Sequence, residues 1–321
     1  MSDSGWQPSA SIATLRLRAE LLRRAREYFT ATHALEVETP TLVRAPVTDA
    51  NLESLEVRRA DGSRAGYLHT SPEYAMKRLL CAGAPDIYQV TRVFREGERG
   101  RMHNPEFTMI EWYRLGIDHH ALMRDVEQLL TRLFDGLLQP RPSSHVSYAS
   151  AFQQCLGLDP LACSEAALCA AIAARGGSVP ASVVDDRDGL LDLAMSLHVA
   201  PSFPADRITF LYDFPASQAA LARVDGPVAA RFEAFWGAAE LANGFDELGD
   251  ATEQAARFAA DAAHRARRGQ PQRALDRDFL AALRAGLPRC SGVALGFDRV
   301  VMLAARTAHI DEVLAFPAER A

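Results

Sequence analysis

A charged loop flanked by two alternating stretches constrains the fold of this chain more than any other sequence feature. Residues 86–95 and 105–115 both alternate apolar with polar side chains, which is the period of a β-strand that buries one face. The loop between them contains glycine and is rich in charge. Two such strands predict a long antiparallel hairpin. The pattern therefore favours an antiparallel sheet over a Rossmann-type parallel one.

Helical and extended segments alternate along the rest of the chain. An apolar period of 3.6 residues predicts a helix over 12–31, with Ser9 or Ser11 as its N-cap. A strand over 35–40 is expected to stop at Pro40, which has no N–H for a sheet. Further elements are expected as helices at 72–82, 119–135 and 252–268, strands at 208–214 and 231–245, and a glycine-rich strand running into a helix at 292–305. Together they predict an α+β fold, an antiparallel β-sheet flanked by helices.

Length and composition bound the domain organisation. The 321 residues allow one large domain or two smaller ones, and 48% hydrophobic with 24% charged residues is typical of a globular protein. We expect a single domain over 1–321 with a mostly helical insertion around 150–205. The proline- and serine-rich stretch 139–144 is the best candidate for a linker.

Cysteine usage and charge bear on the compartment and on the partner. The five cysteines are an odd number and no pair has C-x-x-C spacing, so neither a zinc site nor a disulfide framework is expected, and a reducing compartment is. The N-terminus lacks an apolar signal-peptide core, and no apolar run is long enough to span a membrane. We therefore expect a cytoplasmic location and no membrane partner. The net charge of -6 disfavours a nucleic-acid partner.

The charged hairpin loop is the first candidate for chemistry. The two common glycine-rich phosphate loops do not occur in the sequence, so side chains would have to hold the phosphates of a nucleotide. Residues 95–107 supply three arginines, a histidine and several acids, and arginine suits bidentate phosphate contact. Phe107 at the loop base can stack on a base ring. The same composition also describes a solvated hairpin tip with surface ion pairs.

Three further segments contain candidate site residues, and each can also be explained by an ordinary structural role. Glu240 and Glu247, at the end of an expected strand, can share a Mg²⁺ that bridges phosphates, or they are ordinary surface acids. The small residues of 291–299 let the backbone approach a ligand, with Arg299 opening a helix, or they serve close strand–helix packing. Residues 70–73, Thr-Ser-Pro-Glu, contribute to a site or cap a helix.

The order of these motifs resembles that of the class II aminoacyl-tRNA synthetases. The strand that ends at Pro40, Phe94-Arg95 followed by residues 103–107, and Gly-Phe-Asp-Arg at 296–299 resemble the three motifs of that family. The runs HNPEFTMIEWY and ELANGFDEL resemble its lysyl branch in particular. The resemblance covers about residues 10–318 and implies a class II aminoacyl-tRNA synthetase catalytic core.

Length narrows the resemblance to short paralogues of the lysyl enzyme. The helix of the first motif begins near residue 12, which leaves no room for the N-terminal OB domain that binds the anticodon in that branch. Ala294 replaces the middle glycine of the third motif. The resemblance implies activation of (R)-β-lysine with ATP and Mg²⁺, and transfer to a lysine side chain of elongation factor P. It also implies a homodimer formed through the helix and strand of the first motif, without binding of the tRNA anticodon.

The resemblance also implies a role for each matching residue. Arg95 and Arg299 would be catalytic, Arg95 on the α-phosphate and the attacking carboxylate, and Arg299 on the γ-phosphate. ATP would contact Arg95, Glu96, Gly97, Arg101, His103, Asn104, Phe107, Glu240, Leu241, Gly296 and Arg299. The amino acid would contact Ser71, Pro72, Glu73, Glu111, Tyr113, Glu247 and Ala294. Mg²⁺ would be held by Glu240 and Glu247. Ala294 would help to select β- over α-lysine.

One departure and two other functions stay open. The family reads Phe-Arg-Asn-Glu where this chain continues from Arg95 to Glu96 and Gly97, so an acidic contact at the loop tip would have to come from Glu96 or Glu98. A lysine-activating enzyme that uses tRNA or another small acceptor is one alternative. A non-catalytic regulatory module on a synthetase core is the other. The sequence settles neither the choice between α- and β-lysine nor the surface that docks the acceptor.

Overall fold

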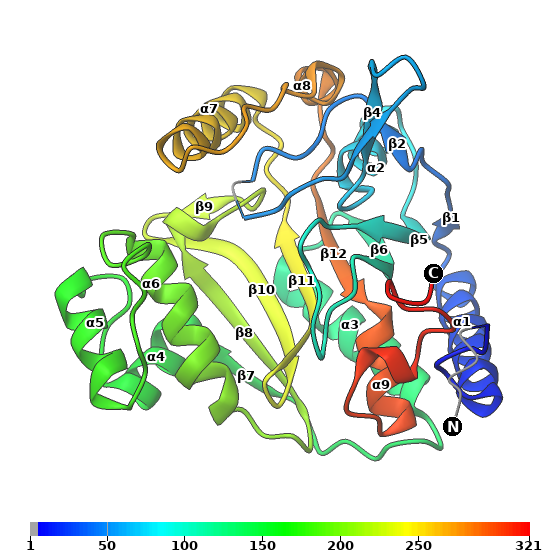
Figure 1. The fold of residues 1–321 in the computed structure, drawn as a ribbon, viewed down its shortest axis with the longest axis horizontal. Coiled ribbons are helices and arrows are strands. Elements are labelled where there is room, and N and C mark those ends of the chain that lie inside the picture. The colour runs from blue at the N-terminus through cyan, green and yellow to red at the C-terminus, as the bar shows by residue number, and fades with distance from the viewer. Residues whose placement is uncertain (1–5, 50) are drawn as a thin grey trace. The chain divides into compact units, whose positions relative to one another are not determined.

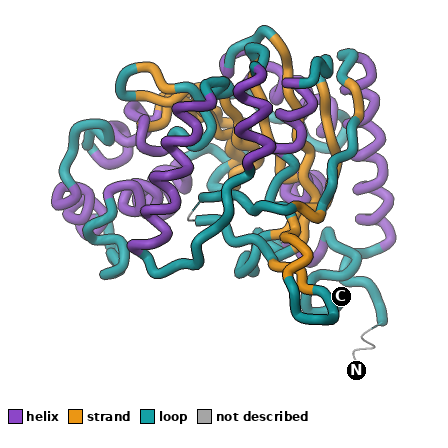
Figure 2. The backbone as a smooth tube through the Cα atoms, turned by 90° about the horizontal axis from the view of Figure 1, so that it is seen from above, coloured by secondary structure: helices purple, strands orange, loops and turns teal. Residues whose placement is uncertain are grey.

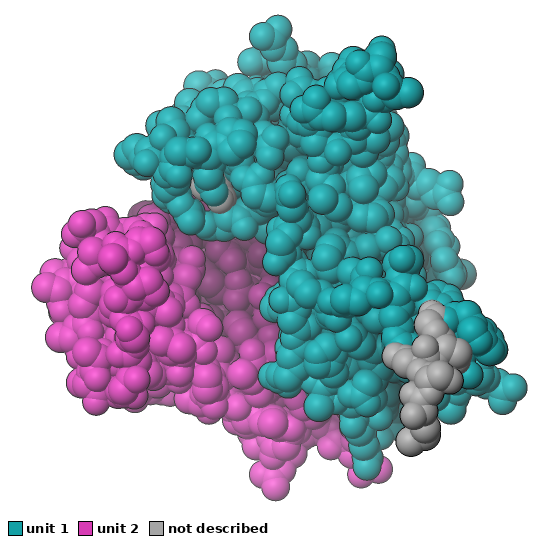
Figure 3. Space-filling view, viewed as in Figure 1, with its two compact units in different colours: residues 1–117, 132–137, 248–321 teal, residues 118–131, 138–247 magenta. Residues whose placement is uncertain are grey.

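The computed structural model describes residues 6–49 and 51–321 of the chain (Figure 1). Its internal contacts divide it into two compact units, coloured separately in Figure 3. The first unit contains residues up to 117 together with 132–137 and 248–321, and the second contains 118–131 and 138–247. The expectation of a single domain over 1–321 stays a prediction.

The first unit opens with the long amphipathic helix α1 (Ile12–Ala31), which has the predicted bounds. Ser11 is its N-cap and accepts a hydrogen bond of 3.1 Å from the backbone N–H three residues later. The buried face of α1 packs on aromatic side chains. The Phe29 ring stacks on Tyr88 at 4.2 Å between centroids and meets the edge of Trp112 at 5.4 Å. These contacts fix α1 against two strands of the same unit.

Four strands form the sheet of the first unit. In sheet order they are β1 (Leu35–Glu36), β5 (Ile87–Phe94), β6 (Glu106–Leu115) and β12 (Cys290–Gly296). β5 and β6 pair antiparallel along all 8 residues of β5, which confirms the predicted hairpin. β12 pairs antiparallel with β6, whereas β1 pairs parallel with β5.

The segment after α1 differs from its prediction. Strand β1 covers only two residues of the expected 35–40, although Val37 N–H still donates to Tyr88 at 2.9 Å. The chain then enters a small second sheet that periodicity did not predict. Its order is β2 (Leu42–Val43), β4 (Arg64–Leu68) and β3 (Glu56–Arg58). Strands of two to five residues are too short to show an alternating pattern.

Three of the remaining helices of the first unit, α2 (Glu73–Cys81), α7 (Ala251–Arg267) and α9 (Phe297–Ala305), lie in segments where the sequence predicted a helix. The unit also contains α8 (Arg277–Ala285) and the 3₁₀ turn Ile310–Glu312. The ring of Tyr74 on α2 stacks on Phe279 of α8 at 4.5 Å. Helix α8 was not expected from the sequence. It packs on α2 and α7.

A buried carboxylate connects three elements of this unit. Asp298 on α9 is 2% exposed and accepts a hydrogen bond of 2.9 Å from the backbone N–H of Thr108 on β6. Its other oxygen pairs with the guanidinium of Arg18 on α1. Arg18 in turn donates to the Thr108 hydroxyl at 2.6 Å. One ion pair therefore connects α1, β6 and α9, which carry the three motifs.

The second unit contains a mostly antiparallel set of strands. In order they are β11 (Ala239–Asp246), β10 (Val228–Trp236), β8 (Ile208–Pro215) and β7 (Ser144–Ser147), with β9 (Val224–Asp225) beside β10. The expected stretch 231–245 is a hairpin of two strands. Gly237 allows its tight turn, because its φ of 55° is in the left-handed region. β7 pairs parallel with β8.

Helices also belong to the second unit, and one of them, over 148–156, packs on β7 and β8. Figure 2 draws the helices of the chain in purple and the strands in orange. The helices of this unit are α3 (His119–Phe134, up to residue 131 in this unit), α4 (Tyr148–Leu156), α5 (Glu165–Ala174), α6 (Arg187–Ala194), the π-helical Met195–Val199, and the 3₁₀ turns Ala200–Ser202 and Ala216–Gln218. Their apolar core includes Phe152, Leu190 and Leu211. Both units thus agree with the predicted α+β class.

Across the described ranges 6–49 and 51–321, no helix combines the length and apolarity that a membrane crossing needs.

The Arg18–Asp298 contact leads to a stability prediction. Asp298→Ala would leave Arg18 as an uncompensated buried charge, which costs roughly 3–5 kcal/mol. We expect the urea-unfolding midpoint, followed by circular dichroism, to fall accordingly. Arg141→Ala in the second unit is the matched control and should leave the midpoint unchanged, because its ion pair with Asp206 is exposed. Equal midpoints for the two variants would contradict the assigned role.

Candidate active site

Arg95 is held where the hairpin loop begins, directly after β5. Its backbone N–H donates to the Pro105 carbonyl at 2.9 Å, which closes the base of the loop. Its guanidinium carbon lies 5.1 Å from the centre of the Phe107 ring, and Nη1 lies 3.4 Å from Glu98 Oε1. Among the described residues, Arg95 Nε is buried without a hydrogen-bond partner. Arg95 is therefore positioned by its neighbours and keeps donor capacity for an anion.

Arg299 and His103 meet although 196 residues separate them in sequence. Arg299, in the first turn of α9, lies with Nη2 2.7 Å from His103 Nε2, and its Nε donates to the Met102 carbonyl at 3.4 Å. Arg101 is anchored through its carbonyl, which accepts from Ile310 N–H at 2.9 Å. The loop thus lies along the C-terminal segment. Of the three residues predicted to hold the phosphates here, His103 and Arg299 lie together, with His103 Nε2 accepting from the guanidinium, while Arg101 Nη1 donates to the Ala308 carbonyl at 3.4 Å.

The rest of the loop serves mainly to fix its shape. Asn104, 4% exposed, donates to the Glu106 carbonyl at 2.7 Å and accepts from Ala318 N–H at 3.1 Å. Arg99 forks onto Asp311 at 2.8 and 3.0 Å. These bonds connect the loop to the C-terminal segment at several points, so the loop is held in place before any ligand binds.

The loop tip accounts for the departure from the family pattern. Gly97 has a φ of 79°, a left-handed conformation that favours glycine. The backbone N–H of Glu96 donates to the Glu53 carbonyl at 2.8 Å. Of the two acids considered, Glu98 is the one that faces Arg95. Sequence reasoning kept Glu98 only as an alternative to Glu96 for an acidic contact with ATP, and the structure places its side chain against Arg95.

A second cluster in the same unit is acidic and buried. Glu111 on β6 is 2% exposed and accepts hydrogen bonds of 2.7 Å from both the Ser71 and Tyr113 hydroxyls. Glu73 Oε1 lies 2.7 Å from the Lys77 ammonium. Burial, together with the charge of Glu73, raises the pKa of Glu111 to about 7. Two carboxylates share one lysine, so the cluster suits a cationic ligand.

The local fold explains how these residues meet. The Ser71 hydroxyl accepts from Glu73 N–H at 3.0 Å and so starts α2, which places Lys77 one turn further on. The antiparallel register pairs Ala294 on β12 directly with Glu111 on β6. Directly opposed residues share a sheet face. Ala294 therefore adjoins the predicted amino-acid pocket, as the sequence hypothesis requires. Lys77 was not predicted, although it is the only lysine in the chain.

Pro72 and Gly296 act through the backbone. Pro72 precedes α2 as its N-cap residue, and Gly296 does the same for α9. Gly296, the last residue of β12, pairs with Met109 of β6. Both lie beside residues already in the two clusters, and both were predicted to contact a ligand.

The acids predicted to bind metal lie in the second unit. Glu240 is half-buried on β11, and Glu247, 4% exposed, follows the end of that strand. In a regular strand, residues seven positions apart point to opposite faces. The register with β10, however, shifts between Ala234 and Phe235, which leaves Leu241 as an extra, bulged residue. The bulge returns Glu240 to the face of Glu247.

This face of the strand pair carries further charge. Arg231 and Glu233 on β10 share it, and Arg231 Nη2 lies 2.5 Å from Glu233 Oε1. Burial, reinforced by the charge of Glu240, raises the pKa of Glu233 to about 7. Arg231 Nε also donates to Asn243 Oδ1, the side-chain amide oxygen, at 3.2 Å. Carboxylates gathered on one strand face fit a hard divalent cation such as Mg²⁺. Leu241, with its side chain buried, offers only its backbone.

Comparisons with known proteins identify the family of the chain. Residues 7–320 match the family described as tRNA synthetases class II (D, K and N). A curated protein of Pseudoalteromonas translucida, named elongation factor P–(R)-β-lysine ligase, is 47% identical over 328 residues and covers 100% of both chains. Proteins with the same name from Vibrio cholerae and Klebsiella pneumoniae subsp. pneumoniae are 47% and 49% identical, with coverage of 100% and 98% of each chain.

The buried Glu111 leads to a prediction on pH. Its ordinary pKa is 4.5, so between pH 4.5 and about 7 the folded chain keeps a proton that the unfolded chain has lost. The free energy of unfolding therefore falls as the pH rises through this window, by up to about 1.4 kcal/mol per unit. We expect Glu111→Gln to reduce the slope by this contribution when urea unfolding is measured from pH 5 to 8, while Glu233, whose pKa is also raised to about 7, keeps its own contribution. A wild-type slope unchanged in the variant would contradict the raised pKa.

Proposed function

The chain belongs to the class II tRNA synthetases described as D, K and N, and on that premise we propose that it is an ATP-dependent ligase that β-lysylates elongation factor P. It would activate (R)-β-lysine as an aminoacyl-adenylate and transfer it to the side-chain amine of a lysine on that factor. Relatives that carry this name and are 47–49% identical along their length support the proposal. The observation that carries it in the structure is the buried acidic cluster around Glu111, next to the strand that leads into the arginine-rich loop.

The first step needs a cationic, preorganised site and no protein nucleophile. The carboxylate of the amino acid attacks the α-phosphate of ATP, pyrophosphate leaves, and negative charge builds up on the phosphoryl oxygens. Arg95, held by Glu98 and the Phe107 ring, would stabilise that charge at the α-phosphate. Arg299 and His103 would bind the leaving pyrophosphate. Because these groups are in place beforehand, little reorganisation accompanies the reaction.

Mg²⁺ is the cofactor that the resemblance implies beside ATP. Glu240 and Glu247, brought to one strand face by the bulge at Leu241, would hold Mg²⁺, which neutralises phosphate charge when bound. Asn104 and Phe107 would place the adenine, and Gly296 would let the backbone approach the nucleotide. The fixed loop supports these roles, since its hydrogen bonds hold Asn104 in a single position.

The acidic cluster would select the amino acid. β-Lysine carries two ammonium groups, and Glu111 and Glu73 offer two carboxylates beside the Ser71 and Tyr113 hydroxyls. An uncharged analogue would leave a buried carboxylate unpaired, which costs roughly 2–5 kcal/mol. Ala294, opposite Glu111 in register, adds a methyl group that would favour the shifted amine of β-lysine.

The second step requires only that an acceptor amine reaches the adenylate. An unprotonated lysine amine of elongation factor P attacks the acyl carbon, AMP leaves, and the amine gives up a proton as the amide forms. No side chain of this chain is needed as a covalent intermediate. The alternative acceptor, a tRNA hydroxyl, would react at the same carbon, so the acceptor has to be identified by experiment.

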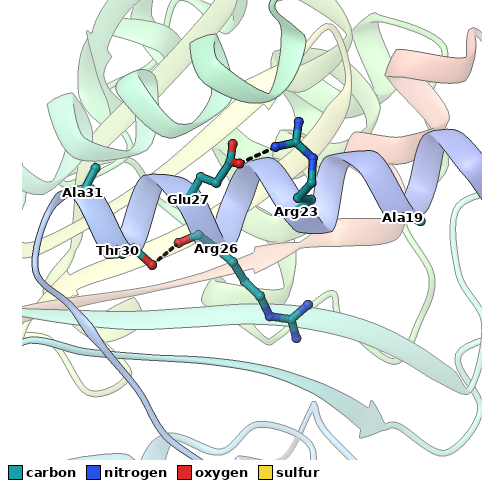
Figure 4. A pocket seen from close by; sticks show the side chains of 6 residues that line it. All are labelled: Ala19, Arg23, Arg26, Glu27, Thr30 and Ala31. Atoms are coloured by element: carbon teal, nitrogen blue, oxygen red, sulfur yellow. Dashed lines mark hydrogen bonds and ion pairs between the residues drawn. The ribbon is translucent and has the colours of Figure 1, made fainter.

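We assign the homodimer interface to the outer face of α1 and the neighbouring β1. Figure 4 shows a shallow hollow on α1 lined by Ala19, Arg23, Arg26, Glu27, Thr30 and Ala31. Ile12 and Leu35, at 60% and 51% exposed, lie on the same two elements. Apolar side chains left exposed at a helix and a strand edge suit a second copy of the chain.

The thiols support a cytoplasmic location for this ligase. All five cysteines are thiols in the structure. Such a composition is stable in a reducing compartment.

The central experiment is a transfer assay. Protein, ATP, Mg²⁺ and (R)-β-lysine are incubated with elongation factor P, and intact-mass spectrometry looks for one added β-lysyl group. We expect the mass shift with (R)-β-lysine and little with α-lysine. Efficient charging of tRNA without any shift on elongation factor P would overturn the proposed acceptor. An absence of ATP–pyrophosphate exchange with either amino acid would support the non-catalytic alternative instead.

Arg299→Ala tests the nucleotide site. We expect ATP–pyrophosphate exchange to fall by roughly 10²–10³-fold, since one preorganised donor to developing charge is lost. Arg306→Ala, at the exposed end of the same helix, is the matched control and should exchange normally. Circular dichroism checks that both variants fold. Normal exchange in Arg299→Ala would refute its assigned role.

Leu35→Asp tests the interface. A carboxylate at the centre of an apolar contact would be desolvated, so we expect light scattering to report half the wild-type mass at micromolar concentration. Val224→Asp, an exposed apolar residue of the second unit, serves as the control. A wild-type chain that is monomeric under the same conditions would rule the interface out.

A further inference from the structure

Two histidines and an aspartate, none of them assigned a role above, meet in the second unit. His119 and His120 open α3, and Asp213 lies near the end of β8. One ligand atom from each of the three lies within 4.8 Å of the others. The two imidazole rings lie 4.1 Å apart between centroids. We call these three residues the His–His–Asp cluster.

The backbone at Asp213 is shaped to direct its side chain. Its φ is 58°, a left-handed conformation that is unfavourable for residues other than glycine and least so for aspartate and asparagine. In the ladder with β10, Phe214 pairs with Ala229 and Tyr212 pairs with Phe232. Asp213 therefore faces two residues of β10 across a bulge. Bulges of this kind re-aim a side chain, here toward the start of α3.

His119 is buried, at 8% exposed, and its imidazole nitrogens lack hydrogen-bond partners among the described residues. Its Nε2 lies 3.6 Å from Asp213 Oδ1, beyond hydrogen-bond distance. Buried polar groups almost always have partners, since an unsatisfied one is costly. A cation between the nitrogen and the carboxylate would satisfy both.

We propose that the His–His–Asp cluster binds a divalent transition-metal ion, with Zn²⁺ as the best-fitting ion. Neutral imidazole nitrogens and a carboxylate oxygen are ordinary zinc ligands, and three protein ligands with one open position make a common coordination set. His120 is exposed and provides access for the ion. The proposal stands independently of the proposed ligase activity.

The local charges are compatible with a cation. The N-terminus of α3 carries positive dipole charge, which opposes a cation. Asp118 caps this helix end, its Oδ1 accepting from Ala121 N–H at 2.8 Å. With Asp213, two carboxylates offset the dipole. An anion would be repelled by the same carboxylates.

Sequence reasoning could not find this cluster. The cysteine pattern predicted no zinc site, and the cluster contains no cysteine. The histidines and Asp213 are more than ninety positions apart in the printed sequence, so no local spacing links them. Only the pairing of β8 and the position of α3 within the second unit bring them together.

The test uses the full chain, stripped with a chelator and titrated with Zn²⁺. After gel filtration, elemental analysis should report one Zn²⁺ per chain, with a raised Tm in Zn²⁺ over the stripped protein. Co²⁺ as a probe should give the visible absorption of a nitrogen- and oxygen-ligated ion. Loss of outer-shell partners weakens metal sites about 10–100-fold, so His120→Ala, which removes a ligand, should weaken binding by at least about 100-fold.

Two further variants keep the result unambiguous. His145→Ala removes an exposed histidine of the same unit and should bind as the wild type does. Asp213→Asn preserves the size of the side chain and tolerance of the left-handed backbone while removing its charge, and it should lose the Tm rise. Equal Zn²⁺ uptake by the wild type and His120→Ala, as cysteine-bound zinc would give, overturns the proposal. Stripped wild type that takes up no Zn²⁺ overturns it as well.

Discussion

The buried ion pair between Arg18 and Asp298 is the interaction on which the geometry of the first unit depends. Its two residues and Thr108 come from α1, β6 and α9, and each lies next to something the chemistry needs. Thr108 directly follows Phe107, Asp298 directly precedes Arg299, and Arg18 belongs to the helix of the proposed interface. A shift of this contact would move an adenine-stacking ring and a phosphate-binding cation together. The same contact therefore stabilises the first unit and positions the residues proposed to bind the nucleotide.

Both units bury a glutamate whose charge is not fully neutralised by a basic side chain. Glu111 in one unit and Glu233 in the other are both buried beside a second carboxylate, and both have a pKa raised to about 7. Such groups destabilise the folded chain at neutral pH. A cationic ligand at the first cluster and a divalent cation near the second would each relieve the repulsion. The repulsion between buried carboxylates therefore lies at the positions where a bound cation would relieve it.

Much of the architecture was predictable, because long segments with a regular apolar period predict their secondary structure from sequence alone. The hairpin of β5 and β6 and the bounds of α1 followed from alternation and from the 3.6-residue period. The grouping of the loop residues rested on motif order. What could not be predicted depends on register: regular alternation would place Glu240 and Glu247 on opposite faces, and only the bulge at Leu241 reverses that. The small sheet of β2, β4 and β3 and the left-handed backbone at Asp213 were not predicted either, because neither produces a periodic pattern in the sequence.

The position of Lys77 has one more consequence. It is the only lysine among 321 residues, its side chain is fully enclosed, and Glu73 holds its ammonium. An aminoacyl-adenylate is a reactive mixed anhydride that acylates any accessible, unprotonated amine. An enzyme with lysines around its active-site mouth would tend to label itself. Here every other basic side chain is arginine or histidine, so under the proposed function no lysine amine of the enzyme competes with the acceptor for the activated group.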